Sequence, residues 1–316
     1  MTQTNTETLL SPRTMSNPSI LQFLPLLLRQ SFNRQQMPRT PEPDAVTDAA
    51  ENVVQYDQVM TTKLAIAYAL ALEVIYRARP VGYGGSAIDL ACGPGHFSLC
   101  LAKHLQLDQL VGVDLSRPMV EVAQENAKMQ TLRNVDFQVG DVTDLAHLQT
   151  DSCNLTCFTD AAHHMPDLKT VESVLIEMDR ITKPDGLVVA MDLVRLRTPA
   201  ITERYVRVLG HDYIDRGLPQ FYEDFHNSMY AAWTADELAR TCPRETRRRW
   251  YHLVARGIPS VQFLVGLPER RTRLYVRRSP AWTKAEHPVL AAMQAEWKIA
   301  RRTLFWGSRK LLTQCL

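Results

Sequence analysis

Three acidic residues each follow a short apolar segment, and their carboxylates could hold the polar groups of a ligand. Asp89 lies in the run SAIDL, Asp114 follows the run LVGV, and Asp141 comes two residues after the run VDFQV. Short runs of β-branched and aliphatic residues predict buried strands. Open α/β sheets bind nucleotides at the edge where their parallel strands end. We therefore expect the three carboxylates to gather at one edge, an arrangement that a purely structural domain has no reason to build.

A glycine-rich turn follows the first of these strands. Gly93 and Gly95 lack a Cβ, so the backbone there can approach a ligand closely. A dinucleotide fingerprint needs a third glycine where Ser98 stands, which disfavours that class of ligand. Asp114 comes 19 residues after Gly95, the spacing at which an acid binds ribose hydroxyls. Taken alone, the turn would be equally compatible with a loop that binds nothing.

The segment from Asp89 to Gly95, DLACGPG, resembles the first motif of class I S-adenosylmethionine-dependent methyltransferases, and GVDLS around Asp114 resembles their second. Ala91 departs from the glycine that is commoner in the family. The resemblance implies that Asp89 and the glycine loop hold the amino-acid end of S-adenosyl-L-methionine. It also implies that Asp114 binds the ribose, that Leu115 packs on the adenine and that Asp141 reaches the adenine amino group. The cofactor residues expected on this basis are Asp89, Ala91, Cys92, Gly93, Gly95, Asp114, Leu115, Ser116, Met119, Gly140, Asp141, Val142 and Thr159.

The segment TDAAHHMPD follows a fourth expected strand, residues 153–158, and resembles the corresponding family segment. Histidine titrates near neutrality, so His163 and His164 are candidate bases if the methyl acceptor carries a proton that must leave. We expect one of the two to face the core or cap the next helix. Asp160 would orient the base or bind the substrate. Tyr56 is a candidate acid/base partner of a histidine, although a tyrosine there is more often a core residue.

These elements together predict an α/β fold: a Rossmann-like, doubly wound, mostly parallel seven-stranded sheet with helices on both faces. A helix over 168–181, a turn at 183–186 and a fifth strand over 187–192 complete the cofactor-binding core, residues 86–192. We expect the methyltransferase domain to span 49–266, with a helical cap over 49–80. The connection 193–233 is too long for a simple loop. Its aromatic residues predict a lid that forms a wall for the substrate, with core packing as the alternative.

The amino-terminal region, residues 1–48, is expected to be a flexible segment and linker. Its apolar run over 20–28 is interrupted by Gln22 and Pro25 and is too short to cross a membrane. A short helix that docks on the body is our preferred interpretation, with a weak organelle-targeting signal as the alternative. Prolines at 38, 41 and 43 predict a linker over 38–48. The six cysteines form no C-x-x-C pair, so we expect buried thiols in a reducing cytoplasm, with neither disulfides nor a metal site.

The carboxyl-terminal residues 241–316 carry 16 Lys and Arg against 4 Asp and Glu, whereas the whole chain has a formal charge of only +2. We expect residues 267–316 to form a basic extension with a strand over 274–276 and a terminal helix. Basic residues interleaved with tryptophans are one signature of nucleic-acid binding. An RNA or protein methyltransferase is therefore one alternative to a small-molecule enzyme, and a non-catalytic cofactor-binding subunit is another. The small-molecule acceptor is favoured, and the sequence predicts no oligomeric state.

Overall fold

In the computed structural model, one mixed sheet forms the centre of the molecule. The structure describes residues 20–42, 53–55, 57, 59, 64–78, 84–210, 213–254, 260–269, 297–298, 301–302 and 309–312. Within these residues eight strands lie in the order β3-β2-β1-β4-β5-β7-β6-β8, one strand more than the sequence predicts. The strands are β1 (Ser86–Leu90), β2 (Gln109–Asp114), β3 (Val135–Val139), β4 (Cys153–Thr159), β5 (Thr182–Leu193), β6 (Arg248–Val254), β7 (Val261–Pro268) and β8 (Arg309–Leu312).

The first five strands are parallel to one another, as expected for a doubly wound sheet, and the last three run antiparallel to their neighbours. β5 begins at Thr182, so the expected turn at 183–186 is part of this strand. The register between β4 and β5 shifts between Cys153 and Leu155, which accommodates the extra residues.

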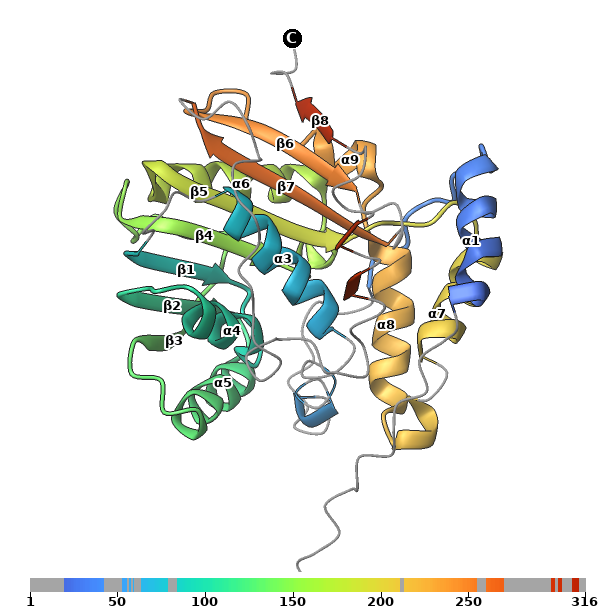
Figure 1. The fold of residues 1–316 in the computed structure, drawn as a ribbon, viewed down its shortest axis with the longest axis horizontal. Coiled ribbons are helices and arrows are strands. Elements are labelled where there is room, and N and C mark those ends of the chain that lie inside the picture. Colours follow the sequence, from blue (N-terminus) through green and yellow to red (C-terminus); the bar gives the residue numbers. More distant parts are fainter. Residues whose placement is uncertain are drawn as a thin grey trace, which may run out of the picture.

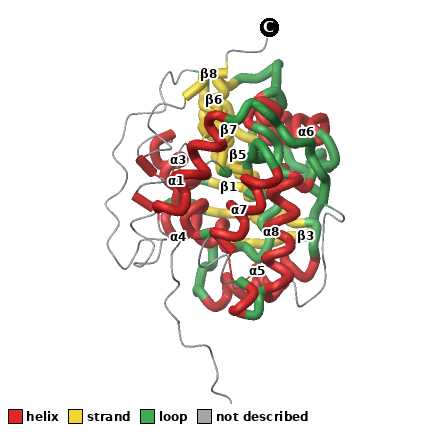
Figure 2. Tube along the Cα trace, turned by 90° about the vertical axis from the view of Figure 1, so that its right-hand side faces the viewer, coloured by secondary structure: helices red, strands yellow, loops and turns green. Residues whose placement is uncertain are grey.

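Helices cover both faces of the sheet (Figure 2). They are α1 (Ile20–Phe32), α3 (Ala65–Ala78), α4 (His96–His104), α5 (Arg117–Met129), α6 (Leu168–Ile181), α7 (Pro199–Gly210), α8 (Pro219–Ala231) and α9 (Ala235–Ala239), with short 3₁₀ turns η1 (Ala162–His164) and η2 (Ile214–Arg216). α6 has the bounds predicted from the sequence. Asp167 caps it by accepting a hydrogen bond from the Thr170 backbone N–H at 2.8 Å.

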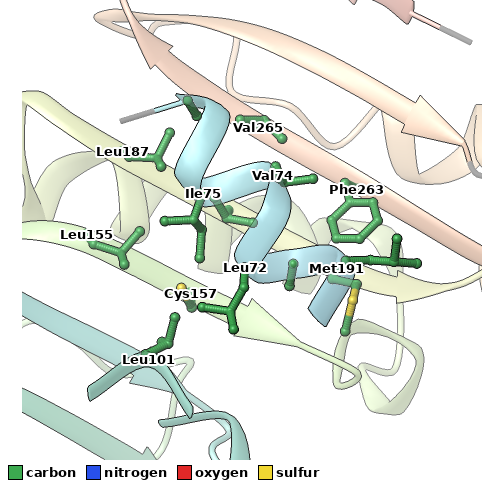
Figure 3. Packing of buried hydrophobic residues seen from close by; sticks show 14 of the residues in the cluster. Leu72, Val74, Ile75, Leu101, Leu155, Cys157, Leu187, Met191, Phe263 and Val265 are labelled. Carbon is green, nitrogen blue, oxygen red and sulfur yellow. The ribbon is translucent and has the colours of Figure 1, made fainter. Parts of the chain in front are cut away.

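The larger core lies between α3 and one face of the sheet. Leu72 and Ile75 of α3 are fully buried against side chains of β4 and β5, and Val74 lies near Phe263 of β7 (Figure 3). α6 packs on the opposite face through its own buried apolar stripe. Burial of one such side chain contributes about 1.5–3 kcal/mol, so these two layers fix the position of the strand ends.

Three helices, α1, α7 and α8, pack together at one end of the sheet. Figure 1 shows α1, α7 and α8 together there. Leu26 of α1 packs with Tyr205 of α7 and Met229 of α8 in a separate cluster. The docked α1 agrees with the interpretation we preferred for residues 20–28.

Residues 33–42, which we call the strap, connect α1 to the sheet's edge. The expected linker over 38–48 is wrong for its described part, residues 38–42. Within the strap, the backbone N–H of Met37 donates to the Arg197 carbonyl at 2.9 Å, and that of Thr40 donates to the Tyr230 carbonyl at 3.2 Å. The strap is therefore bound to the segment that precedes α7 and to α8.

The carboxyl-terminal residues add strands to the sheet. β6 lies in the basic carboxyl-terminal region, directly after the arginine at position 247. β8 pairs with β6, so Arg309 and Lys310 are in a strand and not in the expected terminal helix. The described residues 309–312 of the expected extension therefore belong to the sheet. The expected strand over 274–276 lies outside the described residues. No helix in the described ranges is long and apolar enough to cross a membrane.

Candidate active site

A cavity of about 460 Å³ lies at the edge where β1, β2 and β4 end. Cavities of this size suit small-molecule ligands. The sequence-predicted residues that line it are Ala91, Cys92, Gly93, Asp114, Leu115, Ser116, Met119, Asp141, Val142, Thr159, Asp160 and His164. The strap, α3 and α8 contribute further walls, through Glu42, Tyr68, Gln220, Glu223, Asp224 and Asn227.

The two glycines of the loop after β1 serve different purposes. Gly93 has a φ of 53°, and a Cβ built there would meet nothing within 4 Å, so its backbone borders open space. Gly95 has a φ of 80°, and a Cβ there would lie 2.6 Å from Phe137 and 2.9 Å from Ala123. Gly93 therefore leaves room for a ligand, whereas Gly95 allows α4 to start close to α5 and β3.

Ala91 and Asp160 stand at the ends of β1 and β4 with positive φ angles of 52° each. This left-handed region favours glycine, which explains why the related motif more often has glycine at the position of Ala91. Strained residues of this kind concentrate at functional sites. Both residues line the cavity.

Asp114 anchors the loop to the end of β2. One of its carboxylate oxygens accepts a hydrogen bond from the Gly93 N–H at 2.7 Å, and the other accepts from the Ser116 N–H at 2.9 Å. Ser116 in turn caps α5 by accepting a bond from the Met119 N–H at 3.4 Å. The carboxylate is thereby held in one orientation at the cavity wall.

Asp89 is placed differently from what the sequence predicts. Its side chain is fully buried and does not line the cavity; one oxygen accepts a hydrogen bond from the Ser98 hydroxyl at 2.5 Å, and the other has no hydrogen-bond partner. Burial raises the pKa of this carboxyl to about 7, and the charge of Asp114 adds to the rise. Gly95 and Gly140 also lie outside the lining, because each is packed against a side chain.

The third acid and its neighbours complete the wall on the β3 side. Asp141 accepts hydrogen bonds from the N–H and the hydroxyl of Thr143, at 2.8 and 2.7 Å. Val142 and Leu115 give the same region apolar surface, and Leu115 is 56% exposed. A polar rim beside an exposed leucine is a suitable surface for a planar heterocycle.

The structure separates the roles of the two histidines. His163 is buried, outside the cavity lining, and its Nδ1 lies 2.6 Å from an oxygen of Asp192. Burial alone would lower the pKa of His163, but the charge and hydrogen bond of Asp192, with help from Glu42 and Asp160, raise it to about 9. At neutral pH this ring keeps its proton. His163 is therefore not available as the base that takes a proton from the methyl acceptor.

His164 faces the cavity and contacts Glu42 of the strap. Nδ1 of His164 lies 2.6 Å from one Glu42 oxygen. The other Glu42 oxygen accepts a hydrogen bond from the Ser228 hydroxyl at 2.6 Å. Burial alone would raise the pKa of Glu42, but His164, His163 and Ser228 lower it to about 2. Glu42 is therefore ionised beside the imidazole that lines the cavity.

Asp160 lies between these groups at the end of β4. One of its carboxylate oxygens is buried without a hydrogen-bond partner. Burial raises the pKa of Asp160 to about 7, the charge of Asp192 adds to the rise, and His163 opposes it. A buried oxygen of this kind in a cavity wall is a place where a ligand can donate a hydrogen bond.

Glu42, His163 and His164 each bring one potential ligand atom within 4.8 Å of the others, a group that could hold a metal ion. The sequence did not predict this cluster, because Glu42 fell in the expected linker. The short contacts of His163 with Asp192 and of His164 with Glu42 account for the cluster without a metal.

Arg39 fixes the strap to the loop that carries the histidines. Its guanidinium donates to the backbone carbonyls of His163 and Met165 at 2.8 and 2.9 Å, and to that of Ala231 at 2.7 Å. The same group lies 3.8 Å from the centroid of the Trp233 ring, a cation–π distance. The strap, η1 and α8 therefore form one connected wall.

Several functional candidates were not evident from the sequence. Glu42 and Arg39 lay in a proline-rich segment, and Asp192 was assigned only to the end of a strand. The cavity face of α8 is polar, through Gln220, Glu223, Asp224 and Asn227, whereas its aromatic residue Phe221 packs away from the cavity in a separate cluster. The expected aromatic wall is thus wrong for this helix, and the helical spacing of its polar residues was the available signal. Tyr56 lies outside the described residues.

Comparison with known proteins assigns this architecture to a family. A methyltransferase-domain family model matches residues 83–255, more than half of the chain. A demethylmenaquinone methyltransferase of Desulfitobacterium hafniense is 28% identical over 191 residues, 56% of this chain and 72% of the relative. The uncharacterized methyltransferase YcgJ of Bacillus subtilis is 32% identical over 116 residues, 37% of this chain and only 44% of the relative.

Among solved structures, a putative S-adenosyl-L-methionine-dependent methyltransferase of Methanococcus maripaludis aligns with 74% of this chain and all of its own, at 19% identity and a TM-score of 0.48. Likeness at this level says nothing of what this chain binds. The family model indicates a methyltransferase domain, and so does the glycine loop with the three acids that follow or end the first strands. The chain belongs to the methyltransferase-domain family, among the class I S-adenosylmethionine-dependent methyltransferases.

Proposed function

We propose that this protein transfers a methyl group from S-adenosyl-L-methionine to a small-molecule acceptor. The observation that carries the proposal is the wall formed by Gly93 and Asp114: a glycine backbone that borders open space, beside a carboxylate oriented by two backbone N–H groups. Such a pair suits a ligand with a diol that must approach the backbone closely.

The residues present fit this cofactor. Asp114 would hold the ribose hydroxyls, Leu115 and Val142 would pack on the adenine, and the loop Ala91–Gly93 would border the amino-acid end. The unpartnered oxygen of Asp160 would accept a hydrogen bond from a donor in the same cavity. When bound, the cofactor supplies an activated methyl group on a positively charged sulfur.

The chain's own contribution is to position the acceptor and take up its proton. A sulfonium methyl needs little further activation, so alignment of the acceptor supplies much of the rate. His164 faces the cavity and is the candidate base for an acceptor that loses a proton, with Glu42 as the carboxylate that orients it. The His163 ring, which Asp192 holds in place, lies against the His164 ring and would support it.

Calorimetric titration with S-adenosylhomocysteine tests the proposal directly. We expect one-site binding by the wild type and at least about tenfold weaker binding by Asp114→Ala, because a charge-assisted hydrogen bond to the ribose is lost. Asp108→Ala is the matched control, since Asp108 is exposed and lies outside the cavity lining. Absence of binding by the wild type, or equal binding by Asp114→Ala, would contradict the proposal.

A cytoplasmic location and a small-molecule partner belong to the same proposal. Cys92, Cys100, Cys153 and Cys157 are free thiols, which suits a reducing compartment. In the basic third, Arg248 is buried and donates to the Gly186, Thr182 and Lys183 carbonyls at 2.7 Å each. Arg247 pairs with Asp151 at 2.6 Å. These two arginines are engaged in the fold, which favours a small acceptor over RNA.

A further inference from the structure

The charge of the cavity is one-sided. Six carboxylates line it, from Glu42, Asp114, Asp141, Asp160, Glu223 and Asp224, and the described lining contains no lysine or arginine. Asp114 and Asp141 belong to the cofactor half, where Asp114 accepts backbone N–H groups and Asp141 accepts from Thr143. The other four carboxylates surround the half that remains for the acceptor.

Protein side chains contact only some of the carboxylates in the acceptor half of the cavity. Glu42 is paired with His164, the one imidazole in the described lining. Glu223 is exposed at the cavity, and Asp224 accepts from the Gln220 amide at 3.0 Å through one oxygen while its other oxygen is buried with no hydrogen-bond partner. Asp160 also has a buried oxygen without a partner. Two of the carboxylates that line the cavity thus each have one buried oxygen without a hydrogen-bond partner.

The placement of these acids on α8 is regular. Gln220, Glu223, Asp224 and Asn227 follow the i, i+3, i+4, i+7 spacing of one helix face, and that face lines the cavity. The face of a helix that lies against a ligand site is usually apolar with a few polar groups. Here the face is polar throughout, so it suits a ligand with several hydrogen-bond donors. An anionic ligand would be repelled by it.

We propose that the methyl acceptor carries a positively charged amine, which Asp224 and Glu223 of α8 bind beside His164. This inference rests on the proposed function and names the substrate class of the same site. An ammonium group donates three hydrogen bonds and carries a positive charge, so it satisfies the one free oxygen of Asp224 and offsets the negative charge of this face. A neutral quinol or an alcohol donates a hydrogen bond but leaves that charge uncompensated. Burial raises the pKa of Asp224, and Glu42 and Glu223 add to the rise, which a bound cation would offset.

The cavity also has an apolar surface on which the apolar part of the acceptor could pack. Tyr68, Phe97 and Met165 line the same cavity, and the rings of Tyr68 and Phe97 lie 5.2 Å apart. An acceptor with a compact apolar or aromatic body and an amine at one end therefore matches both surfaces. Phenethylamine, phenethyl alcohol and hydrocinnamate share such a body and differ only in the terminal group, as cation, neutral group and anion.

The test is calorimetric binding of these three probes to the full-length protein saturated with S-adenosylhomocysteine. We expect phenethylamine to bind at least about tenfold more tightly than the alcohol, with hydrocinnamate weakest, and to weaken as salt rises. Asp224→Asn should bring the amine to the level of the alcohol while S-adenosylhomocysteine binding stays unchanged. Asp215→Asn is the control, because Asp215 is exposed on η2 outside the lining.

The order of the three probes on the wild type tests the inference even if Asp224→Asn fails to fold. Equal or tighter binding of the alcohol or of hydrocinnamate would overturn it, as would amine binding that Asp224→Asn leaves intact. Tight one-to-one binding of Zn²⁺ alone, lost in Asp224→Asn, would also overturn it, because a metal would then occupy the carboxylates. Failure to bind S-adenosylhomocysteine at all would instead refute the proposed function.

Discussion

At the scale of single residues, two adjacent histidines differ because of what faces them. His163 has Asp192 against its Nδ1 in a buried site, whereas His164 lines the cavity beside Glu42. A ring that is buried and paired serves to position, and a ring at the cavity can exchange a proton with a ligand. The sequence HH identifies the pair but not the division of roles, because Asp192 lies 29 residues from His163.

The protonated state of His163 predicts a pH-dependent stability. Its folded pKa of about 9 lies above its ordinary value of 6.5, so the folded state binds this proton more tightly than the unfolded state. The resulting stabilisation, on the order of 3 kcal/mol, is complete below about pH 6.5 and is lost as the pH rises through about 9. We expect the free energy of unfolding, measured with denaturant between pH 6.5 and 9.5, to fall more steeply for the wild type than for His163→Gln.

His147→Gln serves as the control for this experiment, since His147 is exposed and should leave the slope unchanged. Asp89 and Asp160, whose pKa values are raised to about 7, also titrate near the lower end of this range and are present in all variants. The slopes are therefore compared above about pH 8, where both carboxyls are mostly ionised. Parallel pH profiles for the wild type and His163→Gln would show that the ring is neutral in the folded protein.

At the scale of elements, apolar patterns were sufficient to predict the parallel strands β1 to β5 and the helix α6. Composition gave the wrong prediction for the strap. Residues 168–181 carry a strong amphipathic pattern with Asp167 as cap, so their bounds were predictable. The strap has no such pattern, and its order depends on bonds from Arg39 to carbonyls 124 to 192 residues away. The polar face of α8 was equally hidden, because a polar helix face normally points to water.

Arg39 is expected to control the order of the strap. Arg39→Ala removes its hydrogen bonds to His163, Met165 and Ala231 and the contact with Trp233. Net contributions of about 0.5–1.5 kcal/mol for each bond predict that amide hydrogen exchange over residues 33–42 speeds up roughly tenfold or more. Mass-spectrometric exchange measures this directly.

Arg34→Ala is the matched control, because Arg34 is an exposed residue of the same strap. If Arg39→Ala and Arg34→Ala exchange at the same rate over this segment, the strap is held by its other bonds, among them those of Met37, Thr40 and Glu42. Glu42 would then reach His164 without help from Arg39.

At the scale of the whole molecule, the carboxyl-terminal strand completes the sheet. β8 pairs with β6 from Arg309 opposite Leu253 to Leu312 opposite Trp250. Without β8, the backbone of β6 would become an open edge, and open edges destabilise a fold and promote association between chains. The basic composition of this region gave no sign of a strand, because pairing over a long sequence distance is invisible in a local pattern.

Truncation after residue 308 should therefore lower the thermal unfolding midpoint and produce concentration-dependent association. The reason is that the free N–H and C=O groups of β6, next to the buried Trp250 and Leu253, become available to a second chain. Truncation after residue 312 removes the following residues but keeps β8, so it separates loss of the strand from loss of the tail. Light scattering over a range of protein concentrations, with thermal unfolding at each, gives both readouts. A protein truncated after 308 that is as stable and as monodisperse as the longer control would show that β7 and β6 alone close this side of the sheet.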